Sequence, residues 1–122
     1  MAEGLSATAA NAALTTLSTT YPYIQLHTAA PGAAGTTAVA TETTRKQVTS
    51  WGTASAGSIA SAVALTWTSI AGSQDATHFT AWSLSSAGVF GFSGTITANA
   101  YTAGDTFTIA SGALTASLPV AS

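Results

Sequence analysis

Ionisable side chains are scarce in this sequence. Its 122 residues include two Lys or Arg and four Asp or Glu, so charged residues amount to 5% of the chain, whereas an ordinary soluble domain carries roughly 25%. The two cations, Arg45 and Lys46, are too few to neutralise a run of phosphates, so nucleic acid is not an expected partner. The chain also lacks a basic amphipathic helix, which argues against a membrane partner.

Cysteine and long apolar runs are both missing. Without cysteine the chain has neither disulfides nor a thiolate metal site, and this fits assembly in a reducing cytoplasm. No stretch reaches the roughly eighteen apolar residues that a transmembrane helix needs. Residues 1–14 lack the cationic start and apolar core of a secretion signal, so we expect none there.

Residues that carry catalysis or bind metals are equally scarce. The histidines are His27 and His78, and neither they nor Asp75, Asp105 and Glu42 stand at a spacing typical of metal ligands. The sequence contains no Gly-x-Ser-x-Gly motif of a serine hydrolase and no Gly-x-Gly-x-x-Gly phosphate loop before a helix. We therefore expect no enzyme activity, no catalytic residue, no metal and no cofactor.

Small residues dominate what remains, since Ala, Thr and Ser make up more than half of the chain. The larger apolar residues nevertheless follow regular spacings, which disordered tracts rarely show. Residues 6–18 predict one short helix, with Ser6 as its N-cap and alanines behind it. Such a short helix needs a surface to dock on, either its own sheet or a neighbouring subunit. Its apolar face would consist of Ala10, Ala13, Leu14 and Leu17.

Short alternating segments predict the rest of the fold. They recur about every ten residues with Gly-bearing turns between them, as in sandwiches and barrels. No helical segment lies between them, so a parallel α/β sheet is not expected. We predict a mainly β fold, an antiparallel β-sandwich or barrel of about six or seven short strands with one short N-terminal helix. The expected strands are 21–28, 46–51, 58–68, 77–84, 89–98, 107–109 and 114–118.

Two further features refine this prediction. Gly91 and Gly94 inside one expected strand indicate a bulge or a close backbone neighbour. The segment Ala33–Thr44 has no clear period and reads as a long loop that is either functional or mobile. We divide the chain into an N-terminal arm and helix, residues 1–20, and a single β domain, residues 21–122.

The order of motifs along the chain is distinctive. A short helix leads into Tyr23-Ile24-Gln25-Leu26-His27-Thr28-Ala29-Ala30-Pro31-Gly32, and the segments 44–48, 63–67, 76–82, 92–97, 103–109 and 112–115 follow in that order. This order resembles a family of small proteins of tailed phages, many from actinobacterial hosts, whose members are labelled minor capsid, cement, tail or tail-fibre proteins. The resemblance covers nearly the whole chain. It implies a structural role in the virion and no catalytic residues, and it leaves head and tail both open.

The scarcity of charge suits an assembled particle. An isolated β domain usually protects its edge strands with Lys, Glu or inward charges, and this chain has few of them. Ser- and Thr-rich faces make interfaces without the cost of burying charges. We expect a closed oligomer, most simply a homotrimer.

The first functional hypothesis is a capsid decoration, or cement, protein on the capsid surface, whose partner is the major capsid protein. The alternative is a minor tail or tail-fibre protein that binds the host surface, including its glycans. The candidate interface residues for these roles are Leu14, Leu17, Pro31, Gly35, Arg45, Lys46 and Trp51.

The three tryptophans differ in their expected roles. Trp67 and Trp82 share their strand faces with Leu65 and Leu84, which favours core packing. Trp51 stands beside Gly52 at a turn, so it is the best candidate for an exposed indole that stacks on a sugar ring.

Overall fold

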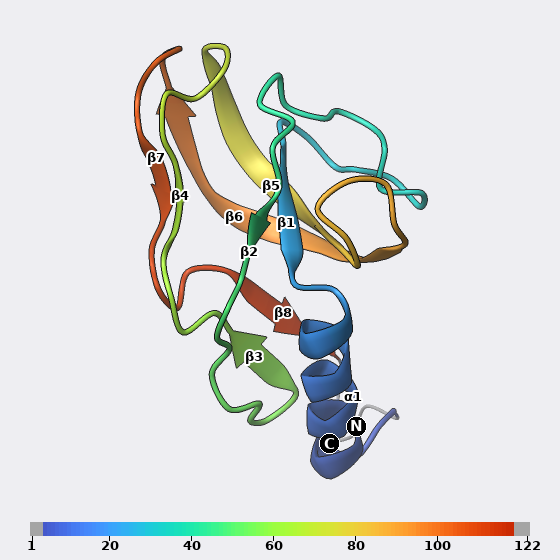
Figure 1. The fold of residues 1–122 in the computed structure, drawn as a ribbon. Helices are drawn as coiled ribbons and strands as arrows, with labels where there is room; N and C mark the ends of the chain where they lie inside the picture. The colour runs from blue at the N-terminus through green and yellow to red at the C-terminus, as the bar shows by residue number, and fades with distance from the viewer. Residues whose placement is uncertain (1–3, 119–122) are drawn as a thin grey trace.

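The computed structural model describes residues 4–118, with the backbone alone for 97–99. The fold is mainly β with antiparallel pairing and one N-terminal helix (Figure 1), which confirms the predicted class. The elements of the described chain are α1 (Ala7–Thr20), β1 (Tyr23–His27), β2 (Lys46–Gln47), β3 (Ser58–Ala60), β4 (Leu65–Trp67), β5 (Gln74–Trp82), β6 (Phe90–Tyr101), β7 (Phe107–Ile109) and β8 (Thr115–Ser117).

A four-stranded sheet forms the centre of the fold. Its order is β2-β1-β5-β6, and every pairing is antiparallel. In the β1–β5 register, Ile24 lies opposite Ala81 and Leu26 opposite Phe79. Alternation along a strand therefore turns these four apolar side chains toward one face of the sheet.

The main core lies between that face and a two-stranded ribbon. β4 pairs with β7, and their inward residues Leu65, Trp67, Phe107 and Ile109 are at most 5% exposed. These side chains belong to one apolar cluster with Ile24, Leu26 and Phe79. The ribbon runs beside the long strands β5 and β6 in Figure 1. Trp67 thus lies in the core, as expected.

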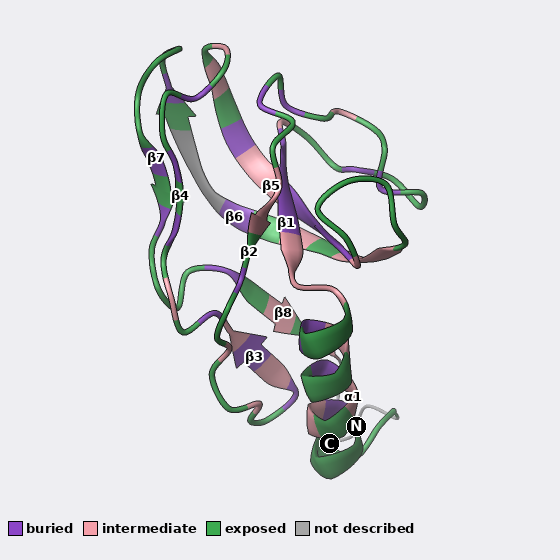
Figure 2. Ribbon diagram, viewed as in Figure 1, coloured by how far each residue is buried: buried purple, intermediate pink, exposed green. Residues whose placement is uncertain are grey.

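The helix begins where the sequence predicts. The Ser6 side chain accepts a hydrogen bond from the Ala9 N–H at 3.1 Å, which satisfies one of the free donors of the first turn. Ala10 and Leu14 are buried on the predicted face, and the buried residues follow one side of α1 in Figure 2. The helix contacts β3 and β6. The division into an arm, 1–20, and a β domain, 21–122, remains a proposal.

The predicted strand 58–68 is two strands. β3 pairs with β8, whereas β4 pairs with β7. Between them the Ser61 N–H donates to Leu114 O at 2.9 Å and Ser61 O accepts from the Gly112 N–H at 2.8 Å. The interruption follows from the turn at 110–113, which separates β7 from β8, so that each half of the segment has its own partner.

The segment 28–45, expected as a functional or mobile loop, packs closely on the sheet: residues 38–40 pair along the edge of β1, and on the second face Gly35 lies against the Phe90 ring and Thr37 O contacts His27. The Ala40 N–H donates to Leu26 O at 3.0 Å, and the Thr28 N–H donates to Ala38 O at 2.9 Å. Ala40 is 2% exposed, and Pro31 and Gly35 are also buried. The small side chains of this segment allow it to lie close to the sheet. The segment has no alternating apolar pattern, so the sequence did not indicate this packing.

Glycine allows two close contacts on β6. Ala81 pairs with Phe92 while Trp82 pairs with Phe90, so Gly91 is the extra residue of a bulge. A Cβ on Gly91 would overlap the Tyr21 ring, and one on Gly94 would come within 2.7 Å of the Phe79 ring. The structure thus confirms the predicted bulge, at Gly91, and the predicted close neighbours, Tyr21 at Gly91 and Phe79 at Gly94.

Replacing Gly91 with alanine is expected to destabilise the protein by about 1–3 kcal/mol, because the added methyl group must displace Tyr21 from its packed position. Urea unfolding followed by circular dichroism measures the change. Ser93→Ala, an exposed position on the same strand, is the control and should lie within about 0.5 kcal/mol of the unmodified protein. Equal stability of the two variants would contradict the steric explanation.

Candidate functional site

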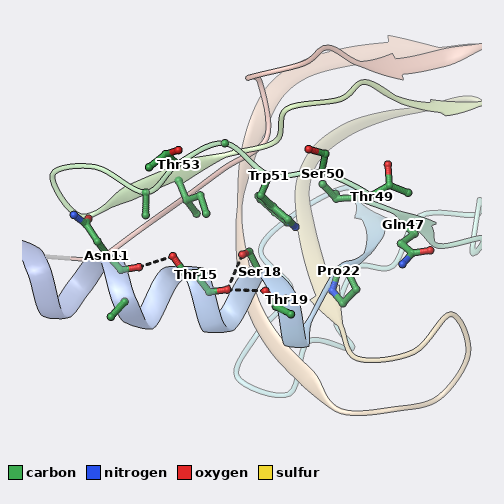
Figure 3. Close-up of a pocket in the computed structure, with 15 residues that line it drawn as sticks. Asn11, Thr15, Ser18, Thr19, Pro22, Gln47, Thr49, Ser50, Trp51 and Thr53 are labelled. Carbon is green, nitrogen blue, oxygen red and sulfur yellow. Dashed lines mark hydrogen bonds between the residues drawn. The ribbon is translucent and has the colours of Figure 1, made fainter.

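A cleft of about 670 Å³ opens between α1 and the segment 47–54 (Figure 3). The helix supplies one wall with Asn11, Thr15, Ser18 and Thr19, and the segment around Trp51 supplies the other. Pocket volumes for small ligands fall in the range of about 300–1,000 Å³. The complete lining is Asn11, Ala12, Thr15, Ser18, Thr19, Pro22, Gln47, Val48, Thr49, Ser50, Trp51, Gly52, Thr53, Ala54 and Ile59.

Backbone bonds hold Trp51 in the wall of the cleft. Trp51 forms a β-bridge with Ser61, and the neighbouring Gly52 N–H donates to Ala60 O at 2.8 Å. The indole is half-buried and packs against the core cluster. Its Nε1 atom is buried without a hydrogen-bond partner among residues 4–118. A buried N–H donor without an acceptor costs free energy, so this atom marks an incomplete part of the site.

The hydroxyl groups of the helical wall point their protons at the helix itself. The Thr15 hydroxyl donates to Asn11 O at 3.0 Å, and the Ser18 and Thr19 hydroxyls both donate to Thr15 O, at 2.9 and 3.0 Å. A hydroxyl that donates its single proton keeps two acceptor lone pairs. The wall therefore offers acceptors to anything in the cleft, and these bonds are drawn in Figure 3.

The cleft is uncharged. None of its fifteen lining residues is Asp, Glu, Lys, Arg or His. Asn11 fixes its amide by accepting from the Gly57 N–H at 3.0 Å, which leaves the NH₂ half of the amide as a donor. The cleft therefore combines one aromatic ring with neutral donors and acceptors.

A chain of hydrogen bonds lies on the second face of the sheet, under the segment 28–45. His27 is 0% exposed; its Nδ1 lies 2.8 Å from Thr37 O and its Nε2 lies 2.8 Å from Thr80 Oγ1. The Trp82 indole N–H also donates to Thr80 Oγ1, at 2.7 Å. Thr37 O can only accept, so Nδ1 carries the proton, and Nε2 accepts from the Thr80 hydroxyl.

This arrangement favours neutral His27. Burial lowers the pKa of His27 below 6.5, and the nearby His78 lowers it further, while the bond to the Thr37 carbonyl acts in the opposite direction. A proton added at Nε2 would face an oxygen that already accepts from Trp82. Burial therefore favours the neutral imidazole, and in that form the Nδ1–H still donates to the Thr37 carbonyl of the covering segment.

Arg45 closes the same face from outside. Its guanidinium carbon lies 4.2 Å from the centroid of the Trp82 ring, a cation–π distance. Its Nη1 donates to Leu84 O at 3.0 Å and to Ala87 O at 2.6 Å, in the β5–β6 connection. Arg45 thus ties the end of the covering segment to the hairpin.

The structure places the predicted interface residues in different surroundings. Leu14, Pro31 and Gly35 are buried within the chain. Leu17 is half-buried and lines a smaller groove of about 380 Å³ with Phe92 and residues 115–118. These residues do not form one surface, and their part in an interface stays a prediction.

The remaining predicted interface residues lie apart from that groove. Lys46 is half-buried on β2, opposite Ile24, whereas Arg45 makes the internal contacts described above. Trp51 alone of the seven lines the larger cleft.

The sequence placed Trp82 in the core beside Leu84, and the structure separates the two. Trp82 is 8% exposed but lies under Arg45, outside the main core cluster, and Leu84 is 55% exposed. The alternation of His78, Thr80 and Trp82 could have indicated this buried polar face. When such a face is buried, its hydroxyl and indole groups require hydrogen-bond partners. The contact between Arg45 and Trp82 joins positions far apart in the chain, and no local pattern indicates it.

Metal and membrane features are limited in the described chain. Within residues 4–118, no group of three His, Cys, Asp or Glu side chains is placed to hold a metal ion. No helix in the same range is long and apolar enough to span a membrane.

Comparison with protein families gives one informative match. The family model described as "Podophage GP4 fiber I protein gp80" matches residues 1–117 of this chain, which is nearly its whole length. Curated proteins, compared in the same way, give no match.

Stability should fall as the pH drops below 6.5, the ordinary pKa of histidine. The unfolded chain then takes up a proton on His27 that the folded chain resists, so each pH unit below this value costs up to about 1.4 kcal/mol. Above pH 7.5 or so the contribution is complete. Urea unfolding between about pH 5.5 and 7.5, a range above most carboxyl titrations, measures the slope. His27→Gln should flatten it and His78→Gln should retain it; an unchanged slope in His27→Gln would refute the assignment.

Loss of the Arg45 clamp should destabilise the protein. Arg45→Ala removes the stack on Trp82, two hydrogen bonds to hairpin carbonyls and a longer one to Gln25 Oε1, so we expect a loss of about 1–3 kcal/mol. Arg45→Lys should recover little of it, because an ammonium group cannot stack flat while donating to two carbonyls. Lys46→Ala is the matched control, expected within about 0.5 kcal/mol of the unmodified protein. Chemical denaturation gives all three values, and a fully stable Arg45→Ala would refute the clamp.

Proposed function

Since the chain belongs to the Gp80 family of phage fibre proteins, we propose that it is a subunit of a tail fibre that is held in the particle through its uncharged sheet edges. Membership of the family makes it a structural, non-enzymatic component of a phage virion, as the resemblance in the sequence implied. The family favours the tail-fibre alternative over the capsid decoration role that ranked first from the sequence.

The observation that supports attachment through edges is how few charges the described surface carries. Of the ionic residues in 4–118, Glu42 is 9% exposed and accepts from the Ala71 and Thr44 backbone N–H groups. Arg45 is engaged by Trp82 and the hairpin. Lys46, Asp75 and Asp105 are left to charge the described surface. An edge without ionic protection favours pairing with another chain.

Several strands of the described chain present such edges. In the four-stranded sheet the edge strand β6 contains no ionic residue, whereas the other edge strand, β2, contains Lys46; the two-stranded ribbons β3–β8 and β4–β7 contain none. Thr66 and Thr108, paired across β4 and β7, are exposed with hydroxyls 3.3 Å apart. Neutral hydroxyl surfaces enter an interface without the desolvation cost of ion pairs. This supports a homo-oligomer, and a homotrimer is the simplest closed form we propose.

An apolar tip adds to this surface. Leu84 and Val89, in and next to the β5–β6 connection, are 55% and 61% exposed. The two side chains stand on one connection that Arg45 holds in place, so the tip is supported rather than loose. Exposed apolar residues that cluster on a supported loop suit a contact with a second chain.

The purified protein is expected to form trimers at micromolar concentration. Light scattering coupled to size exclusion measures the mass, and Leu84→Lys with Val89→Lys should shift the population toward monomer by about tenfold, since one buried charge without a partner costs at least 1.4 kcal/mol or so. Thr8→Lys, on the exposed side of α1, is the control and should leave the mass unchanged. A stable, freely dissolving monomer would count against the proposal.

The position in the particle is a separate measurement. Electron microscopy of intact virions with the protein labelled should show a small number of copies near the tail. Many copies spread over the head would instead support capsid decoration, with the major capsid protein as partner, and would overturn the tail-fibre proposal.

A further inference from the structure

We propose that the Trp51 cleft binds an uncharged saccharide. This inference goes further than the structural role of a fibre subunit and rests on it, because a sugar site on a fibre would contact a glycan surface. The ligand class follows from three properties of the cleft, which are its size, its hydrogen-bonding groups and its lack of charge.

The size and shape suit a short piece of glycan. The cleft holds about 670 Å³ and is open to solvent along one side of α1, so a chain of sugars could enter without a conformational change. Its surface combines one half-buried indole with aliphatic groups of Ala12, Val48 and Ile59. A pyranose ring has an apolar C–H face and a polar rim, and such a ligand matches a wall that places an indole among hydroxyl groups.

The hydrogen-bonding groups of the cleft match a ligand that both donates and accepts hydrogen bonds. The exposed Thr15 and Thr19 hydroxyls donate their protons to helix carbonyls and present lone pairs, whereas Ser18, which donates in the same way, is 4% exposed. Sugar hydroxyls donate to such lone pairs. Behind the opposite wall, the Trp51 Nε1–H is buried and lacks an acceptor among residues 4–118, so a rotation of the indole that brings this N–H to the cleft would let a sugar oxygen accept from it. A polyol satisfies both walls, whereas a hydrocarbon satisfies neither.

The absence of charge selects neutral sugars. An acidic sugar would lose part of its hydration in the cleft without gaining a cationic partner, because Lys and Arg are absent from the lining. A cationic ligand would meet the same difficulty, since no carboxylate lines the cleft. Neutral hexoses, deoxyhexoses and N-acetylhexosamines therefore fit, while uronic and sialic acids do not.

The experiment uses the full-length protein labelled with ¹⁵N and reads the Trp51 indole N–H signal. The probes are neutral oligosaccharides of glucose, galactose, mannose, rhamnose and N-acetylglucosamine, with oligogalacturonate and sialyllactose as acidic counterparts. We expect at least one neutral probe to shift the Trp51 indole signal saturably, with a Kd on the order of 1 mM. The acidic probes should leave it in place. The Trp67 and Trp82 indole signals, whose N–H groups already donate to Thr44 O and Thr80 Oγ1, serve as internal references.

Two variants test the site without removing its framework. Trp51→Phe keeps an aromatic ring and loses the N–H, and Thr15→Val keeps the shape of the wall and loses an acceptor; each should weaken binding about tenfold. Thr16→Val, exposed on α1 but outside the lining of the cleft, is the matched control and should bind normally. Saturable shifts followed through backbone signals of residues 47–54 remain readable when the indole is replaced.

Defined results overturn the inference. A Trp51 signal that no neutral probe shifts at about 100 times the expected Kd would do so, as would equal binding by both variants and the control. A signal that moves with protein concentration alone would show that a second copy of the chain occupies the cleft. These results are independent of the fibre role, because particle position and oligomer mass are measured without sugar, so either proposal can fail alone.

Discussion

Both faces of the central sheet are covered, and the cover of one of them is fixed by a single cation, Arg45. The first face is closed by the β4–β7 ribbon, whose side chains supply ordinary apolar core. The second is closed by the segment 28–45, and Arg45 on Trp82 is the contact that fixes the end of that segment. Because Arg45 also bonds to Leu84 O and Ala87 O, the same side chain determines where the hairpin tip stands.

How far the sequence predicts this fold depends on whether a pattern is local. The helix, with Ser6 as its cap, and the short strand β7 are local patterns, and they lie where they were expected. The bulge at Gly91 follows from a glycine inside an apolar alternation. The split of the predicted strand 58–68 has a different origin, because its two halves pair with β8 and β7, which lie on either side of the distant turn at 110–113. No property of residues 58–68 indicates where a distant turn will lie.

The same distinction explains the outcome for the candidate site. Trp51 beside Gly52 was identified from a local signal, an indole at a turn, and it does line a cleft. The opposite wall comes from α1, whose polar side was unremarkable in the sequence because Thr15, Ser18 and Thr19 are ordinary residues near a helix end. Arg45 was a candidate interface residue from the sequence, and its contacts within the chain, with Gln25, Leu84 O and Ala87 O, were not indicated by any local pattern. The helical wall of the cleft and the contacts of Arg45 both result from packing between segments far apart in the sequence. Composition and local patterns do not indicate such packing.

The small number of charged side chains on the described surface connects the fold with the proposed roles. Because Glu42 and Arg45 are used inside the described chain, the surface offers almost no long-range electrostatic attraction. Recognition by this protein must then act at contact distance, through hydroxyl groups, exposed apolar side chains and one indole. Such contacts vary little with ionic strength, because screening acts mainly on separated charges. The assembly and sugar contacts that we propose would therefore change little with salt concentration.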